Sequence, residues 1–180
     1  MATRGTQILN PRTGQRSVFL QTAQDTGGAL FQMETFHPAH NAAEPEHIHP
    51  FQESRCQVLA GRLRFRVAGV ERTVKPGEAV IIPPGVAHHF WNDGEVEAHA
   101  IQEFRPALNI EDFFVAYFAL ARDGKLKDSG VPKSALQLAV LLKAYDRVLR
   151  PTNPPRLLQL LLMEVLGPIG RLAGYRPDYT

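Results

Sequence analysis

The fold is decided by residues 77–92, Gly77-Glu78-Ala79-Val80-Ile81-Ile82-Pro83-Pro84-Gly85-Val86-Ala87-His88-His89-Phe90-Trp91-Asn92. The apolar run before Pro83 predicts a strand that ends at Ile82. Pro83 and Gly85 are turn residues, so the chain is expected to reverse tightly directly after that strand. The next strand would then begin by directing the His88 side chain inward.

A second histidine-bearing segment lies upstream. In His47-Ile48-His49, the two imidazoles are separated by one residue. Alternate residues of a strand point to the same face, so a strand here places both rings together. Glu53 follows His49 by four residues, and Gly61 is expected to close the next turn.

The first 105 residues have the pattern of an all-β domain. Short apolar segments at 28–36, 56–59 and 78–82 alternate with Gly, Pro and Asp-Gly turn residues at intervals of roughly 8 to 10 residues. Within 62–67, arginines alternate strictly with apolar residues, which predicts a half-buried strand. This pattern is typical of a β sandwich or barrel.

The periodicity becomes helical after Pro106. A stripe of apolar residues predicts a helix over 109–123, and Ser134 with Gln137 forms a capping box before a second helix that ends near 149. A third, leucine-rich helix is expected over 153–174, bent or broken at Gly167-Pro168. The chain is therefore mainly β with an α tail. We expect three parts: an N-terminal arm packing on the barrel (1–27), the barrel (28–106) and a helical extension (107–180).

Composition and charge exclude several classes of protein. The 180-residue chain (20.0 kDa) is 44% hydrophobic and 21% charged, which is typical of a soluble globular protein. Its 20 basic and 18 acidic residues nearly balance, so no nucleic-acid partner is expected. The most apolar stretch, 157–169, contains Gln159 and Glu164 and is shorter than the ~18 residues of a membrane span. The polar N-terminus and the single cysteine, Cys56, favour a cytoplasmic location.

The two histidine-bearing segments closely resemble the paired motifs of the cupin superfamily. The first resembles His-X-His, three or four residues, Glu, six residues, Gly; the second resembles the pattern from Gly77 to Asn92. The flanking segments at 10–14, 105–108 and 174–176 look like those of bacterial single-barrel cupins with a C-terminal helical extension.

This resemblance implies a single cupin barrel, that is, a double-stranded β-helix or jelly roll, followed by about three helices. It also implies one divalent transition metal ion (Fe, Zn, Mn, Ni or Co) bound by His47, His49, Glu53 and His88. Cupins commonly pair through their sheets, so a homodimer is expected.

One position departs from the cupin pattern. The usual glutamate lies six residues before the glycine, where this chain has Ser54. If Ser54 faces the interior, Glu53 faces outward unless a bulge redirects it. Two metal sites therefore remain open: one in which Glu53 reaches in, and one of three histidines plus water, which suits Zn or Fe.

The residues expected to surround the metal are mostly apolar. Glu53 and His88 are candidate catalytic groups, and the expected pocket residues are Phe31, Met33, Ser54, Phe65, Ile82, Phe90 and His99. The other histidines, His37, His40 and His89, are interpreted as core or surface residues.

Three functions are compatible with these residues. The first is a metal-dependent, dioxygenase-like enzyme acting on an aromatic or dicarbonyl-type small molecule, with Glu53 as ligand or base. The second is a non-catalytic cupin that binds or senses a small ligand. The third is a metal-independent isomerase or cyclase with His88 as general base.

Overall fold

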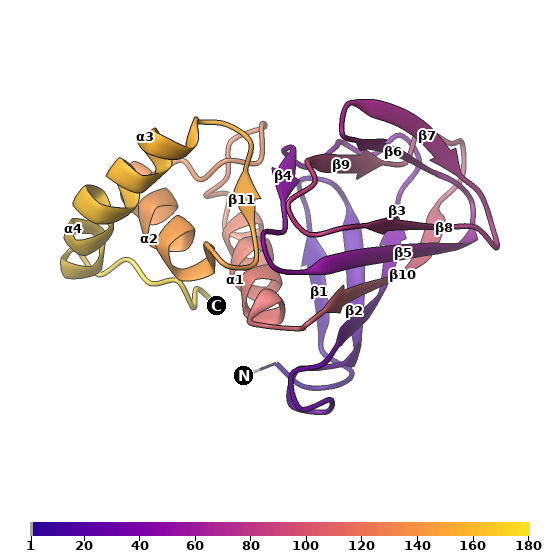
Figure 1. Ribbon diagram of the computed structural model, residues 1–180, viewed down its shortest axis with the longest axis horizontal. Helices are drawn as coiled ribbons and strands as arrows, with labels where there is room; N and C mark the ends of the chain where they lie inside the picture. Colours follow the sequence, from indigo (N-terminus) through magenta and orange to yellow (C-terminus); the bar gives the residue numbers. More distant parts are fainter. Residues whose placement is uncertain (1) are drawn as a thin grey trace.

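Two antiparallel sheets stack face to face, and a group of helices covers one end of them (Figure 1). The computed structural model describes residues 2–180. One sheet has six strands, in the order β1 (Gln7–Asn10), β2 (Gln15–Gln21), β3 (Phe31–His37), β10 (Ala98–Arg105), β5 (Glu53–Ala60) and β8 (Ala79–Ile82). The other has five, in the order β11 (Arg150–Pro151), β4 (His47–Ile48), β9 (His88–Trp91), β6 (Leu63–Val67) and β7 (Val70–Val74). The predicted architecture, mainly β with an α tail, is confirmed.

The core of the barrel lies between the two sheets and follows the alternation of the strands. Leu63 and Phe65 of β6 are buried at 0% and 1% exposure, whereas the arginine between them lies at the surface side of the sheet. They pack with Cys56 and Val58 of β5 and with Val80 of β8. The half-buried strand predicted over 62–67 is therefore present as β6.

The turn between β8 and β9 joins the two histidine-bearing segments. Gly85 has φ +79°, a left-handed conformation that glycine adopts without steric cost. Its backbone N–H donates to the carbonyl of His49 over 2.9 Å. The turn thus holds the start of β9 against the end of β4.

The helical extension consists of α1 (Ile110–Arg122), α2 (Ala135–Tyr145), α3 (Arg156–Leu161), the π-helical turn η1 (Leu162–Leu166) and α4 (Gly167–Leu172). As the capping box predicts, the Ser134 hydroxyl accepts a hydrogen bond from the Gln137 backbone N–H. The predicted irregularity near Gly167-Pro168 is present, as the wide turn η1 directly before it.

The second helix is shorter than predicted. It ends at Tyr145 instead of running to 149, and Arg150–Pro151 form strand β11. A residue before proline favours an extended backbone, and the Asp146 carboxylate binds the side chains of both Arg150 and Arg156 across the intervening turn. These interactions direct the chain back toward the barrel.

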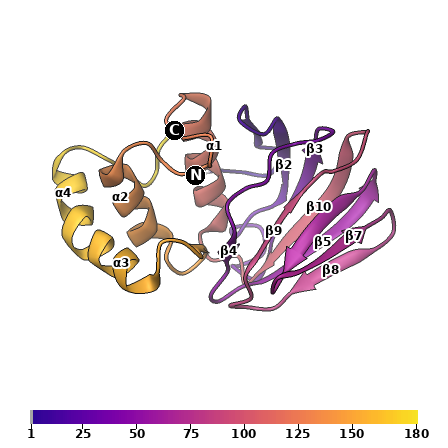
Figure 2. The same ribbon diagram turned by 90° about the horizontal axis from the view of Figure 1, so that it is seen from above.

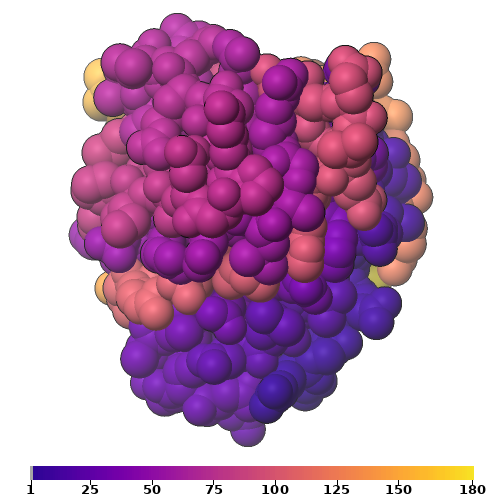
Figure 3. All heavy atoms as spheres, turned by 90° about the vertical axis from the view of Figure 1, so that its right-hand side faces the viewer, coloured from indigo at the N-terminus to yellow at the C-terminus, as the bar shows by residue number. Residues whose placement is uncertain are grey.

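The extension is built into the barrel on one side (Figures 1 and 2). Strand β11 pairs with β4, and a second hydrophobic cluster joins Phe31 and Phe104 of the barrel to Ile110, Leu120 and Tyr145 of the helices. Figure 3 shows the opposite end of the molecule, where residues of the N-terminal arm and of the barrel make up nearly the whole surface. No helix among residues 2–180 has the length and apolar character required to cross a membrane.

The N-terminal arm contributes strands to the larger sheet. Strands β1 and β2 form a hairpin, and β2 pairs with β3 in an antiparallel register. The arm therefore extends the six-stranded sheet at one edge.

Asn92 stabilises the loops at the far end of β9. Its amide donates to the carbonyls of His37 (2.9 Å) and Val96 (2.8 Å), and its side-chain oxygen accepts from the Gly94 N–H. The side chain is fully buried. We expect Asn92→Ala to lower the free energy of unfolding by about 2–4 kcal/mol, because it leaves two buried backbone groups and one partly buried carbonyl without this partner.

Urea denaturation of purified protein measures this effect. The control is Asn109→Ala, because Asn109 lies at the start of α1 without a side-chain capping hydrogen bond and should change the stability by less than about 1 kcal/mol. Equal losses in both variants would contradict a special role for Asn92.

Candidate metal centre

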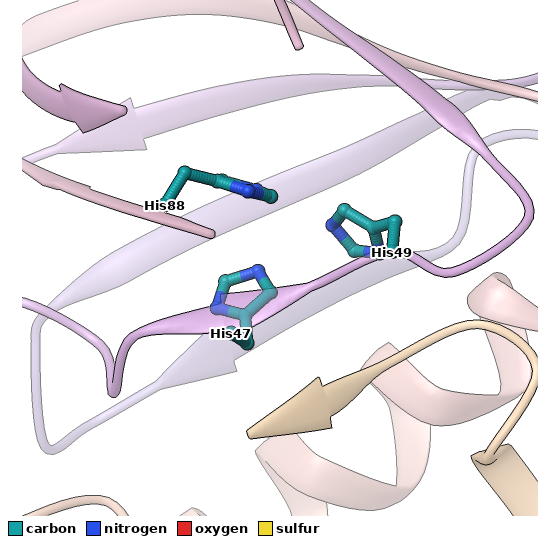
Figure 4. A group of neighbouring side chains, drawn as sticks. All are labelled: His47, His49 and His88. Atoms are coloured by element: carbon teal, nitrogen blue, oxygen red, sulfur yellow. The ribbon is translucent and has the colours of Figure 1, made fainter. Parts of the chain in front are cut away.

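Three imidazoles converge inside the barrel (Figure 4). His47 lies on β4, His49 directly follows it, and His88 begins β9, opposite His47 in the strand register. The ring centroids are 4.6 Å apart for His47 and His88, 5.0 Å for His47 and His49, and 5.2 Å for His49 and His88. One nitrogen from each ring lies within 4.8 Å of the other two. Two metal–nitrogen bonds of about 2.1 Å span up to about 4.2 Å, so small side-chain rotations bring the three nitrogens within reach of one ion.

The backbone selects the nitrogen that each ring offers. Nδ1 of His47 lies 2.8 Å from the carbonyl of Pro45, and Nδ1 of His88 lies 2.9 Å from that of Val86. Nδ1 of His49 forms a hydrogen bond with the carbonyl of Val148. A carbonyl only accepts hydrogen bonds, so all three Nδ1 atoms carry the proton and donate it. The three Nε2 atoms keep their lone pairs, as in metal-binding histidines whose orientation is set by an outer hydrogen bond.

Burial keeps the three rings neutral. Burial is the main cause of the lowered pKa of each ring. It lowers the pKa of His49 to about 3 and the pKa of His47 well below its ordinary value, and it also lowers the pKa of His88. The neighbouring His88 lowers the pKa of the other two further. A neutral imidazole is the form that binds a metal ion. The donor set of three buried, unprotonated nitrogens therefore fits a divalent transition metal.

Glu53 is not brought to this cluster. The pairing of β5 with β8 and β10 runs without a bulge from Glu53 to Val58, so strict alternation applies there. Ser54 faces the interior at 6% exposure, and Glu53 lies on the outer face opposite Arg105. The expected roles of Glu53 as ligand and catalytic group required a bulge at this point, and the regular pairing corrects that expectation. The geometry favours the site of three histidines.

A cavity of about 550 Å³ adjoins the three histidines. It lies between the barrel and the helical extension, and both supply its walls. Four of the residues expected in the pocket line it, namely Ser54, Phe65, Ile82 and Phe90.

Phe31 and Met33 lie behind the cavity wall instead of lining it. Both face inward from β3, but they are fully buried in the cluster under the helices. The rings of Phe104 and Phe114, which do line the cavity, stack on Phe31 at centroid distances of 6.1 Å and 6.2 Å. The pocket prediction for Phe31 and Met33 failed because α1 packs over this part of the sheet.

His99 lies on the opposite face of the sheet. Its Nε2 is 2.6 Å from a carboxylate oxygen of Glu34, and its ring stacks on Phe36 at 4.6 Å. Its neighbours on β10, Ala98 and Ala100, are the residues that face the core. The pocket prediction for His99 is corrected, since a histidine between two inward-facing alanines must point outward.

The sequence did not predict the contribution of the helices to the cavity. The lining from the extension consists mainly of apolar side chains, including Phe113, Phe114, Tyr117, Phe118, Leu141, Leu142, Tyr145 and Leu149. The apolar stripe of the first helix was the available signal, but a stripe alone does not reveal which surface it covers.

A buried polar network closes one side of the cavity. The Glu44 carboxylate accepts hydrogen bonds from Asn10 Nδ2 and the Tyr117 hydroxyl, each over 2.8 Å, and forms an ion pair with Arg12. Burial raises the pKa of Glu44, and Arg12 opposes that shift. This network connects the N-terminal arm, the segment before β4 and α1.

The family model described as "Cupin domain" matches residues 32–102. The barrel is a cupin domain. The matched residues run from β3 to β10 and contain His47, His49 and His88.

Two curated relatives match part of this cupin domain. Protein SchB of Streptomyces halstedii is 34% identical over 61 residues, which are 34% of this chain and 44% of SchB. The tetracenomycin polyketide synthase protein TcmJ of Streptomyces glaucescens is 33% identical over 61 residues, 34% of this chain and 41% of TcmJ. The chain therefore spans less than half the length of these relatives.

Solved structures share the fold. A protein described as a predicted oxalate decarboxylase from Thermotoga maritima has a TM-score of 0.52 and 16% identity, covering 59% of this chain and 99% of its own. An RmlC-like cupin from Shewanella frigidimarina has a TM-score of 0.50 and 20% identity, covering 62% and 93%. At these identities the likeness concerns the fold alone.

The buried neutral histidines should make the stability of the metal-free protein depend on pH. His37 is also buried, and burial lowers its pKa to about 3. When unfolded, these four histidines titrate near 6.5, so below that pH the unfolded state binds more protons than the folded state. The contribution of each histidine to stability is complete above pH 6.5 and is lost as the pH falls toward its pKa in the folded state, which is about 3 for His37 and His49. The loss amounts to up to about 1.4 kcal/mol per pH unit for each histidine.

Urea unfolding in EDTA between pH 7.5 and pH 5.5 checks this dependence. The slope of the unfolding free energy against pH gives the number of protons that the chain takes up on unfolding. His49→Gln should lower this number by about one. A wild-type protein equally stable at both pH values, or a variant with an unchanged slope, would contradict the buried neutral state.

Proposed function

We propose that the chain binds one divalent transition metal ion (Fe, Zn, Mn or Ni) through His47, His49 and His88. With a redox-active ion (Fe, Mn or Ni), the site would support a dioxygenase-like reaction on a small organic molecule. The observation that carries the proposal is the set of three Nε2 lone pairs, each fixed by a hydrogen bond from Nδ1 to a carbonyl, beside an aromatic-walled cavity. A divalent ion bound there would act as a Lewis acid and offer coordination positions to the substrate.

The residues around the site favour an anionic, chelating substrate. Three neutral ligands leave the ion's double positive charge uncompensated, and Ser54 occupies the position of the usual carboxylate. An enolate, a phenolate or a carboxylate supplies the compensating charge. The lining by phenyl rings and leucines then accommodates an apolar or aromatic body.

The cavity and the name of one relative support a proposal for the substrate class. TcmJ is named as a polyketide synthase protein. Polyketides carry 1,3-dicarbonyl units, whose enolates chelate metal ions through two oxygens. We therefore propose an aromatic or 1,3-dicarbonyl substrate of polyketide type.

The lowered pKa of His88 weighs against its acting alone as a general base. Burial disfavours the protonated imidazole, and this makes the ring a weak base near neutral pH. The same property keeps Nε2 free for a metal ion. We therefore favour a metal-dependent enzyme over a metal-independent isomerase or cyclase.

Elemental analysis of protein purified without added metal, combined with an oxygen-consumption assay, tests the proposal. With 1-hydroxy-2-acetonaphthone or acetylacetone as substrate in air, the wild type should contain about one metal ion per chain and consume both oxygen and substrate. His88→Ala should lose at least about tenfold in both metal content and rate, because it removes one of three ligands.

His99→Ala is the matched control, since His99 lies on the outer face and should leave both readouts unchanged. Metal with ligand binding but no turnover would support a binding or sensing cupin instead. Turnover that persists after chelation would support the metal-independent isomerase or cyclase.

We further propose a homodimer in the cytoplasm. The C-terminal helical segment exposes large apolar side chains, namely Leu157, Leu161, Val165, Ile169 and Leu172. A monomer rarely leaves so many large apolar side chains of one helical segment exposed to water. Light scattering should give twice the 20.0 kDa chain mass, and Leu161→Glu should shift the mass toward the monomer. A monomeric wild type at high concentration would contradict this part of the proposal.

A further inference from the structure

Gln102 is a buried side chain whose surroundings in the protein do not satisfy it. It lies on β10 at 5% exposure and lines the cavity. The amide of the buried Gln159 donates to two backbone carbonyls over 2.7–2.8 Å. By contrast, none of the side-chain hydrogen bonds found within residues 2–180 involves Gln102. Among residues 2–180, the fully enclosed side-chain atoms without a hydrogen-bond partner are Arg12 Nε and Gln52 Oε1, so the amide of Gln102 opens on the cavity. A ligand in the cavity can therefore supply the partner that the protein does not.

The strand neighbours of Gln102 offer it no polar group. In the register of the sheet, Gln102 lies opposite Met33 on β3 and opposite Cys56 on β5. Both are apolar core residues, and burial raises the pKa of the Cys56 thiol to about 12. The amide therefore lies between two apolar strand neighbours, and Ser54 is the next polar residue on the inner face of β5.

The pleat of β10 places Gln102 next to a residue that contacts the histidine cluster. Phe104 packs edge-to-face on His49 at a ring distance of 5.1 Å. Gln102 lies two residues before Phe104 on the same face of the strand, which corresponds to about 7 Å. Gln102 therefore lies one same-face position along β10 from the residue that contacts His49.

We infer that Gln102 is a specificity-determining residue, which hydrogen-bonds a second oxygen function of an aromatic ligand, at the end remote from its metal-chelating oxygens. The inference rests on the proposed function and names the substrate class more narrowly. A primary amide both donates and accepts, so the remote oxygen is a carbonyl or a hydroxyl. The ligand carries oxygen at both ends of a ring system whose middle contacts the phenyl rings of the cavity.

Two probes isolate this contact: 1-hydroxy-2-acetonaphthone and its 4-hydroxy derivative. They share the chelating hydroxyketone and differ only in the remote hydroxyl group. Isothermal titration calorimetry under nitrogen, with protein of measured metal content, should show about tenfold tighter binding of the 4-hydroxy compound by the wild type. Gln102→Met keeps the length of the side chain and removes its amide, so it should abolish this preference while leaving the metal content and the affinity for the simpler probe within about twofold.

Gln57→Met is the matched control, because Gln57 lies on the outer face of β5, where its side-chain oxygen accepts a hydrogen bond from Arg55. It should preserve the tenfold preference. A wild type without preference, or a Gln102→Met variant that keeps it or weakens both probes equally, would overturn the role of Gln102 while the metal content still supports the proposed function. Metal-free wild type that still prefers the 4-hydroxy probe would instead overturn the metal-dependent function and leave the amide contact standing.

Discussion

Strand β4 contains only two residues, and the site depends on how this short strand is held on both sides. On one side His47 pairs with His88 of β9, and on the other β4 pairs with β11 of the extension. The carbonyl of Val148, just before β11, also fixes the His49 ring through Nδ1. Because a strand of two residues forms few hydrogen bonds, the position of β4 depends on elements from two distant parts of the chain.

The helical extension is therefore part of the site, in addition to covering the barrel. The barrel supplies the imidazoles and the polar groups of Ser54 and Gln102, whereas the helices supply most of the aromatic and leucine surface. A cavity with a polar, metal-binding end and an apolar body suits an amphiphilic ligand. The metal would neutralise the charged end of such a ligand, and its rings would be transferred from water into the apolar part of the cavity. The same packing explains why Phe31 and Met33 became core residues: the docking of α1 removed them from any surface.

Much of the barrel could be predicted because it depends on local rules. Alternation along β6 predicted which side chains are buried, the residues around Gly85 predicted the turn, and Ser134 predicted the start of α2. The spacing of His47 and His49 predicted their common face. Each of these follows from strand period, turn geometry or capping, which act over a few residues.

The amino-acid sequence by itself determined the cupin barrel, the change to helices after it and the three histidines. Only the tertiary structure decided that Glu53 faces outward and that His99 lies on the outer face of the sheet. It also decided that the second helix ends at Tyr145 and that the helices line the cavity. The physical reason is the same in each case. Whether a strand bulges, which face of a sheet is covered and where a helix docks are set by contacts between segments far apart in the chain, and local periodicity carries no information about those contacts.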